Sequence, residues 1–127
     1  MSTTRHIHTI AWVIIAEAAT LAAASTLHLT GALRHGTDAA GVPEALICVV
    51  LLAGAAALLR DPVRGRGAAL GAVGFAIFGF IVGLTFTISG GSAVDLAYHA
   101  VMLPILVATA VQLRPRHPGT EVSPGIQ

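Results

Sequence analysis

The stretch GAALGAVGFAIFGFIVGLTFTIS fills residues 67–89 and holds no charged side chain. At a rise of 1.5 Å per residue, a helix over this stretch is about 35 Å long, and the hydrocarbon core of a bilayer is about 30 Å thick. An apolar run of this length is typical of a helix that crosses a membrane. The stretch therefore predicts a transmembrane helix.

Three further apolar runs of similar length cover residues 9–30, 43–59 and 93–113. The composition agrees, because 55% of the residues are hydrophobic and only 10% are charged, against about 25% charged in soluble domains. We predict an all-α fold, an integral membrane four-helix bundle formed by one domain over residues 1–114. Residues 115–127 hold three prolines and two glycines, and we expect them to form a flexible cytoplasmic tail.

The arginines set the expected orientation of the bundle. With these four spans, Arg34 lies on one side of the membrane and all other arginines lie on the opposite side: Arg5, Arg60, Arg64, Arg66, Arg114 and Arg116. Because cytoplasmic loops collect Lys and Arg, we place the N-terminus and the C-terminus in the cytoplasm. Loops 31–42 and 89–92 then face outward. We expect a multi-pass protein of a bacterial cytoplasmic (inner) membrane.

Local signals mark the helix ends. Gly31 or Gly36 suits a left-handed cap after the first helix, and Pro43 suits the first turn of the second. The pair Asp61-Pro62 predicts the end of that second helix. The run Ser92-Ala93-Val94-Asp95 fits a capping box at the start of the fourth. These signals agree with the four spans.

Glycines recur at four-residue spacing in the third span. They form two Gly-x-x-x-Gly units, which comprise Gly67, Gly71, Gly79 and Gly83. In lipid, small residues that let two backbones approach closely are a main source of helix association. We predict helix packing along this face, either against another helix of the same chain or against a second protomer.

Glu17 is an ionisable residue near the middle of the first span. At 100° per residue it shares one helix face with small or polar residues, and His28 lies about 16 Å further along the axis. The members of this face are Glu17, Thr20, Ala24, His28, Gly31 and His35. Ionisable groups within a membrane are functional candidates by default. Glu17 is therefore predicted to act in a proton or ion relay, to serve as a counter-ion for a ligand, or to donate an interhelical hydrogen bond as a neutral acid.

A second group of polar residues is predicted at the outward ends of the helices. Asp95 and His99 are four residues apart and share a face, which is a spacing that lets two side chains hold one metal. If the first and fourth helices are neighbours, His28 joins them. The full candidate set for a metal or haem site is His28, Asp95, His99, Glu44 and His35. Imidazole and carboxylate ligands suit Cu, Zn or Fe, and His28 with His99 alone suits a b-type haem.

Other roles are open for the same residues. Asp95 fits the capping box, Glu44 in the first turn of a helix interacts favourably with the helix dipole, and His99 suits an interfacial anchor. The group can also act as an ionisable gate or relay. The spacing does not choose between these roles.

The segment Ala11-Trp12-Val13-Ile14-Ile15-Ala16-Glu17-Ala18 resembles the first helix of small multidrug resistance transporters. That family has about this length, four spans and a membrane-embedded Glu that couples protons to drug export. The resemblance covers this helix only, since the third span and the segment 95–99 follow a different pattern. It implies a homo-oligomeric, proton-coupled transporter in which Glu17 carries the proton.

The rest of the sequence limits the function. A net charge of +1 offers nothing to nucleic acid, and the single cysteine, Cys48, excludes an intrachain disulfide. No motif of a soluble enzyme is present, so we expect no catalytic activity of its own. Our leading hypothesis is an auxiliary subunit of a membrane complex that holds the metal or haem site, with lipid and other membrane subunits or further copies of the chain as partners. The alternative hypothesis is the proton-coupled transporter.

Overall fold

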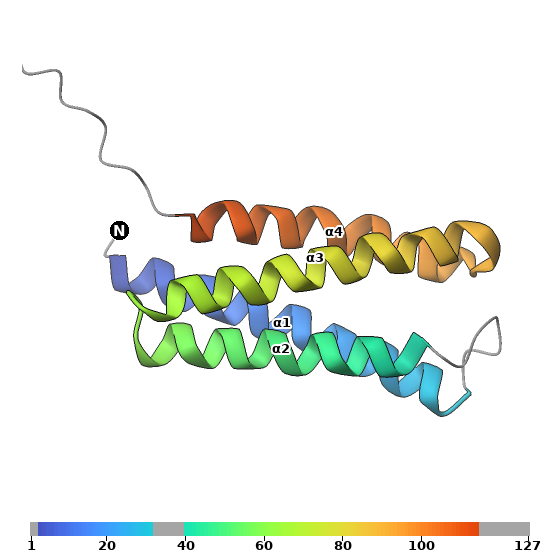
Figure 1. Cartoon of the computed structure of the whole chain (residues 1–127), viewed down its shortest axis with the longest axis horizontal. Coiled ribbons are helices and arrows are strands. Elements are labelled where there is room, and N and C mark those ends of the chain that lie inside the picture. The colour runs from blue at the N-terminus through green and yellow to red at the C-terminus, as the bar shows by residue number, and fades with distance from the viewer. Residues whose placement is uncertain (1–2, 32–39, 115–127) are drawn as a thin grey trace, which may run out of the picture.

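The computed structural model describes residues 3–31 and 40–114 of the chain. Four helices fill this part: α1 (Thr3–Leu29), α2 (Gly41–Arg60), α3 (Gly65–Gly90) and α4 (Ala93–Leu113). They run alternately up and down beside one another, as Figure 1 shows. All four are long and apolar enough to cross a membrane. The prediction of an all-helical, membrane-spanning four-helix bundle is confirmed.

The helices begin and end where local chemistry stops them. Gly31 adopts a φ of 68°, a left-handed conformation, and its N–H donates to the carbonyl of His28 at 3.1 Å. Asp61, which precedes Pro62, is extended and ends α2. The capping box is confirmed at α4, where the Ser92 hydroxyl accepts from the Asp95 N–H and the Asp95 carboxylate accepts from the Ser92 N–H.

α1 begins at Thr3, six residues before the first predicted span, which begins at residue 9. Arg5, His6 and His8 are part of the helix, although they are too polar for the hydrocarbon core. A helix can continue past the hydrocarbon, because its backbone groups are satisfied internally wherever its side chains reach water or headgroups. The helix and the membrane span thus have different limits.

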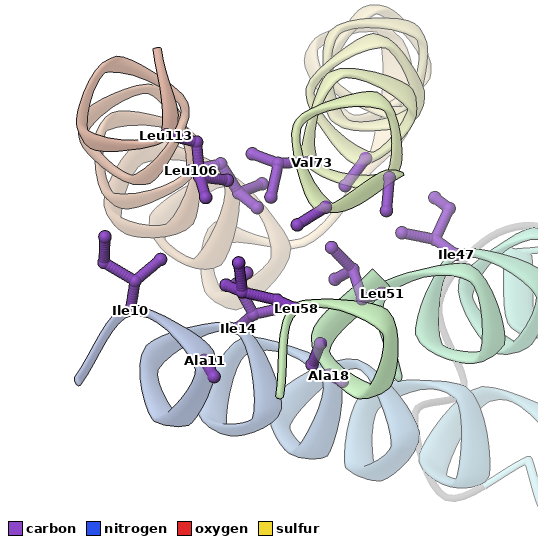
Figure 2. Packing of buried hydrophobic residues seen from close by; sticks show 14 of the residues in the cluster. Ile10, Ala11, Ile14, Ala18, Ile47, Leu51, Leu58, Val73, Leu106 and Leu113 are labelled. Carbon is purple, nitrogen blue, oxygen red and sulfur yellow. The ribbon is translucent and has the colours of Figure 1, made fainter. Parts of the chain in front are cut away.

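The core contains side chains from all four helices (Figure 2). Ile14, Leu51, Val73 and Leu106, one from each helix, are fully buried and point toward one another. The outer faces are equally apolar, and Trp12, Phe78, Phe86 and Ile88 are exposed. Such faces suit lipid, since a soluble protein rarely exposes so much apolar surface.

The four helices are not packed equally. Helices that follow one another in the chain pack extensively, α1 against α2, α2 against α3 and α3 against α4, whereas the contact between α1 and α4 is much smaller. We call the contact between α1 and α4 the α1/α4 seam. We call the end of the bundle that carries His28, Glu44 and Asp95 the histidine end. The opposite end is the arginine end, and it carries Arg5, Arg60, Arg64, Arg66 and Arg114.

Candidate functional site

Three ionisable side chains from three helices meet at the histidine end. His28 is in the last turn of α1, and Glu44 and Asp95 are in the first turns of α2 and α4. The Nδ1 atom of His28 lies 2.8 Å from Glu44 Oε2, and its Nε2 atom lies 3.7 Å from Asp95 Oδ1. All three side chains are largely buried. We call this group the His28 cluster.

The His28 cluster is arranged as an ion-paired group. Each nitrogen of the imidazole faces one carboxylate: Nδ1 is within hydrogen-bond distance of Glu44, and Nε2 is within ion-pair distance of Asp95 but too far for a hydrogen bond. Asp95 also binds locally, because its Oδ2 atom accepts from the hydroxyl of Ser92 at 2.8 Å. One carboxylate thus caps α4 and at the same time contacts α1.

His99 lies next to this cluster but uses its ring differently. Its Nδ1–H donates to the carbonyl oxygen of Asp95 at 2.8 Å, since a carbonyl can only accept. The ring packs edge-on against Phe80, and its Nε2 atom faces Gly83 on α3. A Cβ at Gly83 would lie 2.8 Å from that nitrogen, so the glycine makes room for the imidazole.

Of the five residues predicted to form a metal or haem site, the structure brings His28, Glu44 and Asp95 together and places His99 beside them. His35 lies outside the described residues. Within residues 3–31 and 40–114, no group of three or more His, Cys, Asp or Glu side chains is placed to hold a metal ion. The nitrogens of His28 face the carboxylates of Glu44 and Asp95. The Nδ1–H of His99 donates to a backbone carbonyl, and its Nε2 faces α3.

Glu17 lies deeper, halfway along α1, and is only 3% exposed. Its Oε1 atom is 3.1 Å from the hydroxyl of Thr109 on α4. Its Oε2 atom is also buried and has no hydrogen-bond partner among the described residues. A buried carboxyl oxygen without a partner is rare, because such a group normally finds protein or water. The Glu17 carboxyl is therefore a candidate for function.

Thr109 is a site residue that sequence reasoning missed. On α4 the buried positions are Met102, Leu106, Thr109 and Leu113, which follow helical spacing, and Thr109 is the hydroxyl among them. A polar residue at a core position of a membrane helix usually has a partner on another helix. That spacing was the available signal, but it does not name Glu17 as the partner.

One more polar pair and a small hollow lie along the α1/α4 seam. Toward the histidine end, the hydroxyls of Thr20 and Tyr98 are 3.1 Å apart at the exposed edge of the seam. Toward the arginine end, Thr109 borders a hollow of about 80 Å³ that Thr9 and Gln112 also line. Ile10 and Val13 line it as well, so its walls are mixed, and a hollow of this size is large enough for water. Polar groups therefore follow the seam on both sides of Glu17.

The four glycines predicted to pack have different surroundings. A Cβ at Gly79 would lie 2.5 Å from Ile47 of α2, and Gly83 touches His99 as described. Gly67 and Gly71 have no heavy atom of the described residues within 4 Å of an added Cβ. The arginine-end half of this face is thus open toward the surroundings of the bundle.

Comparisons with protein-family models, with curated proteins and with solved structures gave no match for this chain. The chain is a small multi-pass membrane protein of four apolar helices. Its candidate site consists of the His28 cluster at one end and the buried Glu17–Thr109 pair in the middle of the bundle.

Proposed function

We propose that this protein transfers protons within the membrane, and that Glu17 is the group that takes up and releases the proton. The single observation that carries the proposal is the buried carboxyl of Glu17, which has one oxygen on Thr109 and the other without a partner. An ionised carboxylate is costly at this depth. In this proposal the proton-bound acid is the resting form, and the carboxylate is the transient form.

The contact with Thr109 supports both forms without movement of heavy atoms. The Thr109 hydroxyl lies 2.9 Å from the carbonyl of Ile105 and 3.1 Å from Glu17 Oε1, yet it has one hydrogen. When that hydrogen points to Ile105, a protonated Glu17 donates to Thr109. When Glu17 loses its proton, rotation of the hydroxyl turns Thr109 into the donor. The Thr109 hydroxyl and the Ile105 carbonyl therefore stabilise the acid and the carboxylate of Glu17 in turn.

The seam supplies polar groups on both sides of Glu17. Toward the histidine end these are the Thr20–Tyr98 pair and then the ionisable side chains of the His28 cluster. Toward the arginine end it is the hollow with Thr9 and Gln112. Water molecules complete the route between these groups, and the loose packing of α1 on α4 favours their entry.

The burial of Glu17 limits what can reach it. With 3% of the residue exposed, the carboxyl is accessible to a proton or a water molecule but not to an organic substrate in this conformation. We therefore propose proton transfer as the basic activity. Export of a drug, which the resemblance of the first helix implies, would need α1 and α4 to separate.

Proton flux into vesicles tests the proposal. Protein in liposomes that contain a pH-sensitive dye should acidify the lumen when a potassium gradient and valinomycin impose an inside-negative potential. Glu17→Gln keeps the shape of the side chain but cannot release a proton, so its flux should fall to that of empty vesicles. Asp61→Asn removes a carboxylate at the arginine end and should leave the flux unchanged.

A second variant distinguishes a role of Glu17 in transfer from a role in folding. Thr109→Val keeps the shape of that side chain and leaves the acid in place, but it removes the group that stabilises the carboxylate. Flux should drop while the circular dichroism spectrum stays that of wild type. Wild-type flux equal to that of empty vesicles, or full flux in folded Glu17→Gln, would refute the proposal.

The metal or haem site and the role as an auxiliary subunit stay predictions, as does location in a bacterial inner membrane. Elemental analysis and an absorption spectrum of protein purified in mild detergent test the first. A metal at one per chain, or a Soret band, that disappears in His28→Ala/His99→Ala would support it, and a colourless, metal-free wild type would contradict it. Copurification of a defined second chain would support the subunit role.

A further inference from the structure

A hollow of about 390 Å³ lies at the arginine end, away from the α1/α4 seam residues discussed above. Its walls come from α1, from the turn at 61–64, from α3 and from the last turn of α4. They include Ile7, Pro62, Val63, Arg66, Leu70 and Leu113. All of these side chains except Arg66 are apolar. The volume is within the range of ligand sites in proteins.

Arg66 is the charged residue in this hollow, and within residues 3–31 and 40–114 no acidic side chain forms an ion pair with it. Its Nε atom is buried and has no hydrogen-bond acceptor among the described residues. The nearest acid in sequence, Asp61, is already used, because its side chain accepts from the N–H groups of Val63 and Arg64 and lies 3.9 Å from the Arg64 guanidinium. A buried guanidinium donor without an acceptor is unfavourable. Arg66 is therefore the group that would attract an anion to this hollow.

The walls of the hollow indicate what kind of anion fits. A guanidinium binds phosphate well, because its planar donors match two phosphate oxygens. Ile7, Leu70 and Leu113 continue the hollow with hydrocarbon, next to helices that cross the bilayer. A molecule with a phosphate at the membrane surface and a hydrocarbon chain beside it matches both properties. Basic pockets between transmembrane helices bind acidic lipids in this way.

We propose that this hollow binds an anionic phospholipid, with the phosphate on Arg66 and one acyl chain along Ile7, Leu70 and Leu113. The proposal is independent of proton transfer, because it uses a different part of the bundle. Arg5, Arg60, Arg64 and Arg114 at the same end add a favourable field for a negative headgroup. The bound lipid would hold the ends of α1, α3 and α4 together where the turn at 61–64 is exposed.

Lipid binding can be measured on the full chain by native mass spectrometry from a neutral detergent. Phosphatidylglycerol should form a one-to-one complex, and phosphatidylcholine and inorganic phosphate should not compete with it at equal concentration. Arg66→Gln removes the charge-assisted bonds, so the affinity for phosphatidylglycerol should fall about tenfold or more. Arg66→Lys keeps the charge but loses the planar donors, so its affinity for phosphatidylglycerol should lie between those of wild type and Arg66→Gln.

Arg64→Gln is the matched control. It removes the same charge two residues away, but the side chain of Arg64 is 92% exposed and does not line the hollow. Its affinity for phosphatidylglycerol should stay within about twofold of wild type, as expected for an exposed charge.

Equal losses of affinity in Arg64→Gln and Arg66→Gln would overturn the proposal in favour of a general charge effect. Displacement of the lipid by inorganic phosphate alone would overturn the assignment to a lipid. Because the mass spectrum counts complexes of folded protein, a destabilised Arg66→Gln still gives a result.

Discussion

Replacing Gly65 with Ala should lower the free energy of unfolding by about 3 kcal/mol, at the upper end of the usual effect of overpacking. Gly65 is the first residue of α3 and is buried against the end of α2. A Cβ there would overlap the carbonyl of Ala57 and lie 2.6 Å from the nitrogen of Leu58. These are backbone atoms of a helix, so they cannot rotate away as a flexible side chain does. The turn between α2 and α3 would have to open.

Thermal unfolding in detergent, followed by circular dichroism, measures this effect. Gly74→Ala is the matched control, because Gly74 is on the same helix and an added Cβ meets no described heavy atom within 4 Å. Alanine favours a helix over glycine by about 1 kcal/mol, so Gly74→Ala should be neutral or stabilising. If both variants lose similar free energy of unfolding, the close approach at Gly65 is not the cause of the loss in Gly65→Ala.

His28→Ala should destabilise the protein by about 2 kcal/mol, the usual cost of leaving a buried polar group without its hydrogen-bond partner. The change leaves the carboxylates of Glu44 and Asp95 without the imidazole that lies between them. Both side chains are at most 20% exposed, so water replaces the lost partner poorly. The same unfolding experiment measures the loss.

A second substitution identifies its cause. In His28→Ala/Glu44→Gln the neutral amide removes one uncompensated charge, so the double variant should be more stable than His28→Ala alone. His8→Ala is the control, because His8 is an exposed histidine of the same helix, and its effect should stay within about 0.5 kcal/mol. A double variant less stable than the single one would show that the lost packing of the imidazole, and not its charge, is responsible.

Much of the fold could be predicted because its signals are local. The length of each apolar run determines a membrane-spanning helix, since the backbone must satisfy its hydrogen bonds within the segment. Gly31 and the Ser92–Asp95 capping box end or begin helices through contacts between residues at most three apart. The expected common face of Asp95 and His99 also follows from four-residue spacing, although the contact is between the ring and the backbone carbonyl.

The candidate site could be predicted only in part. The sequence selects His28, Glu44, Asp95 and Glu17, because ionisable residues are rare in membrane spans. It does not identify Thr109 as the partner of Glu17, which is 92 positions away in the chain. Nor does it reveal that Gly79 and Gly83 are covered, whereas Gly67 and Gly71 are open.

The sequence by itself therefore determined the number of helices, their approximate limits and the rare polar side chains that they carry. The tertiary structure decided how each helix is rotated about its axis and which helices are neighbours. The physical reason is that α2 and α3 are apolar on nearly all sides and α1 has only a narrow polar stripe, so the sequence does not tell which side of each helix is inward. Close approach of small residues such as Gly54 to Ala72, and pairing of the few polar groups, fixes the rotation instead.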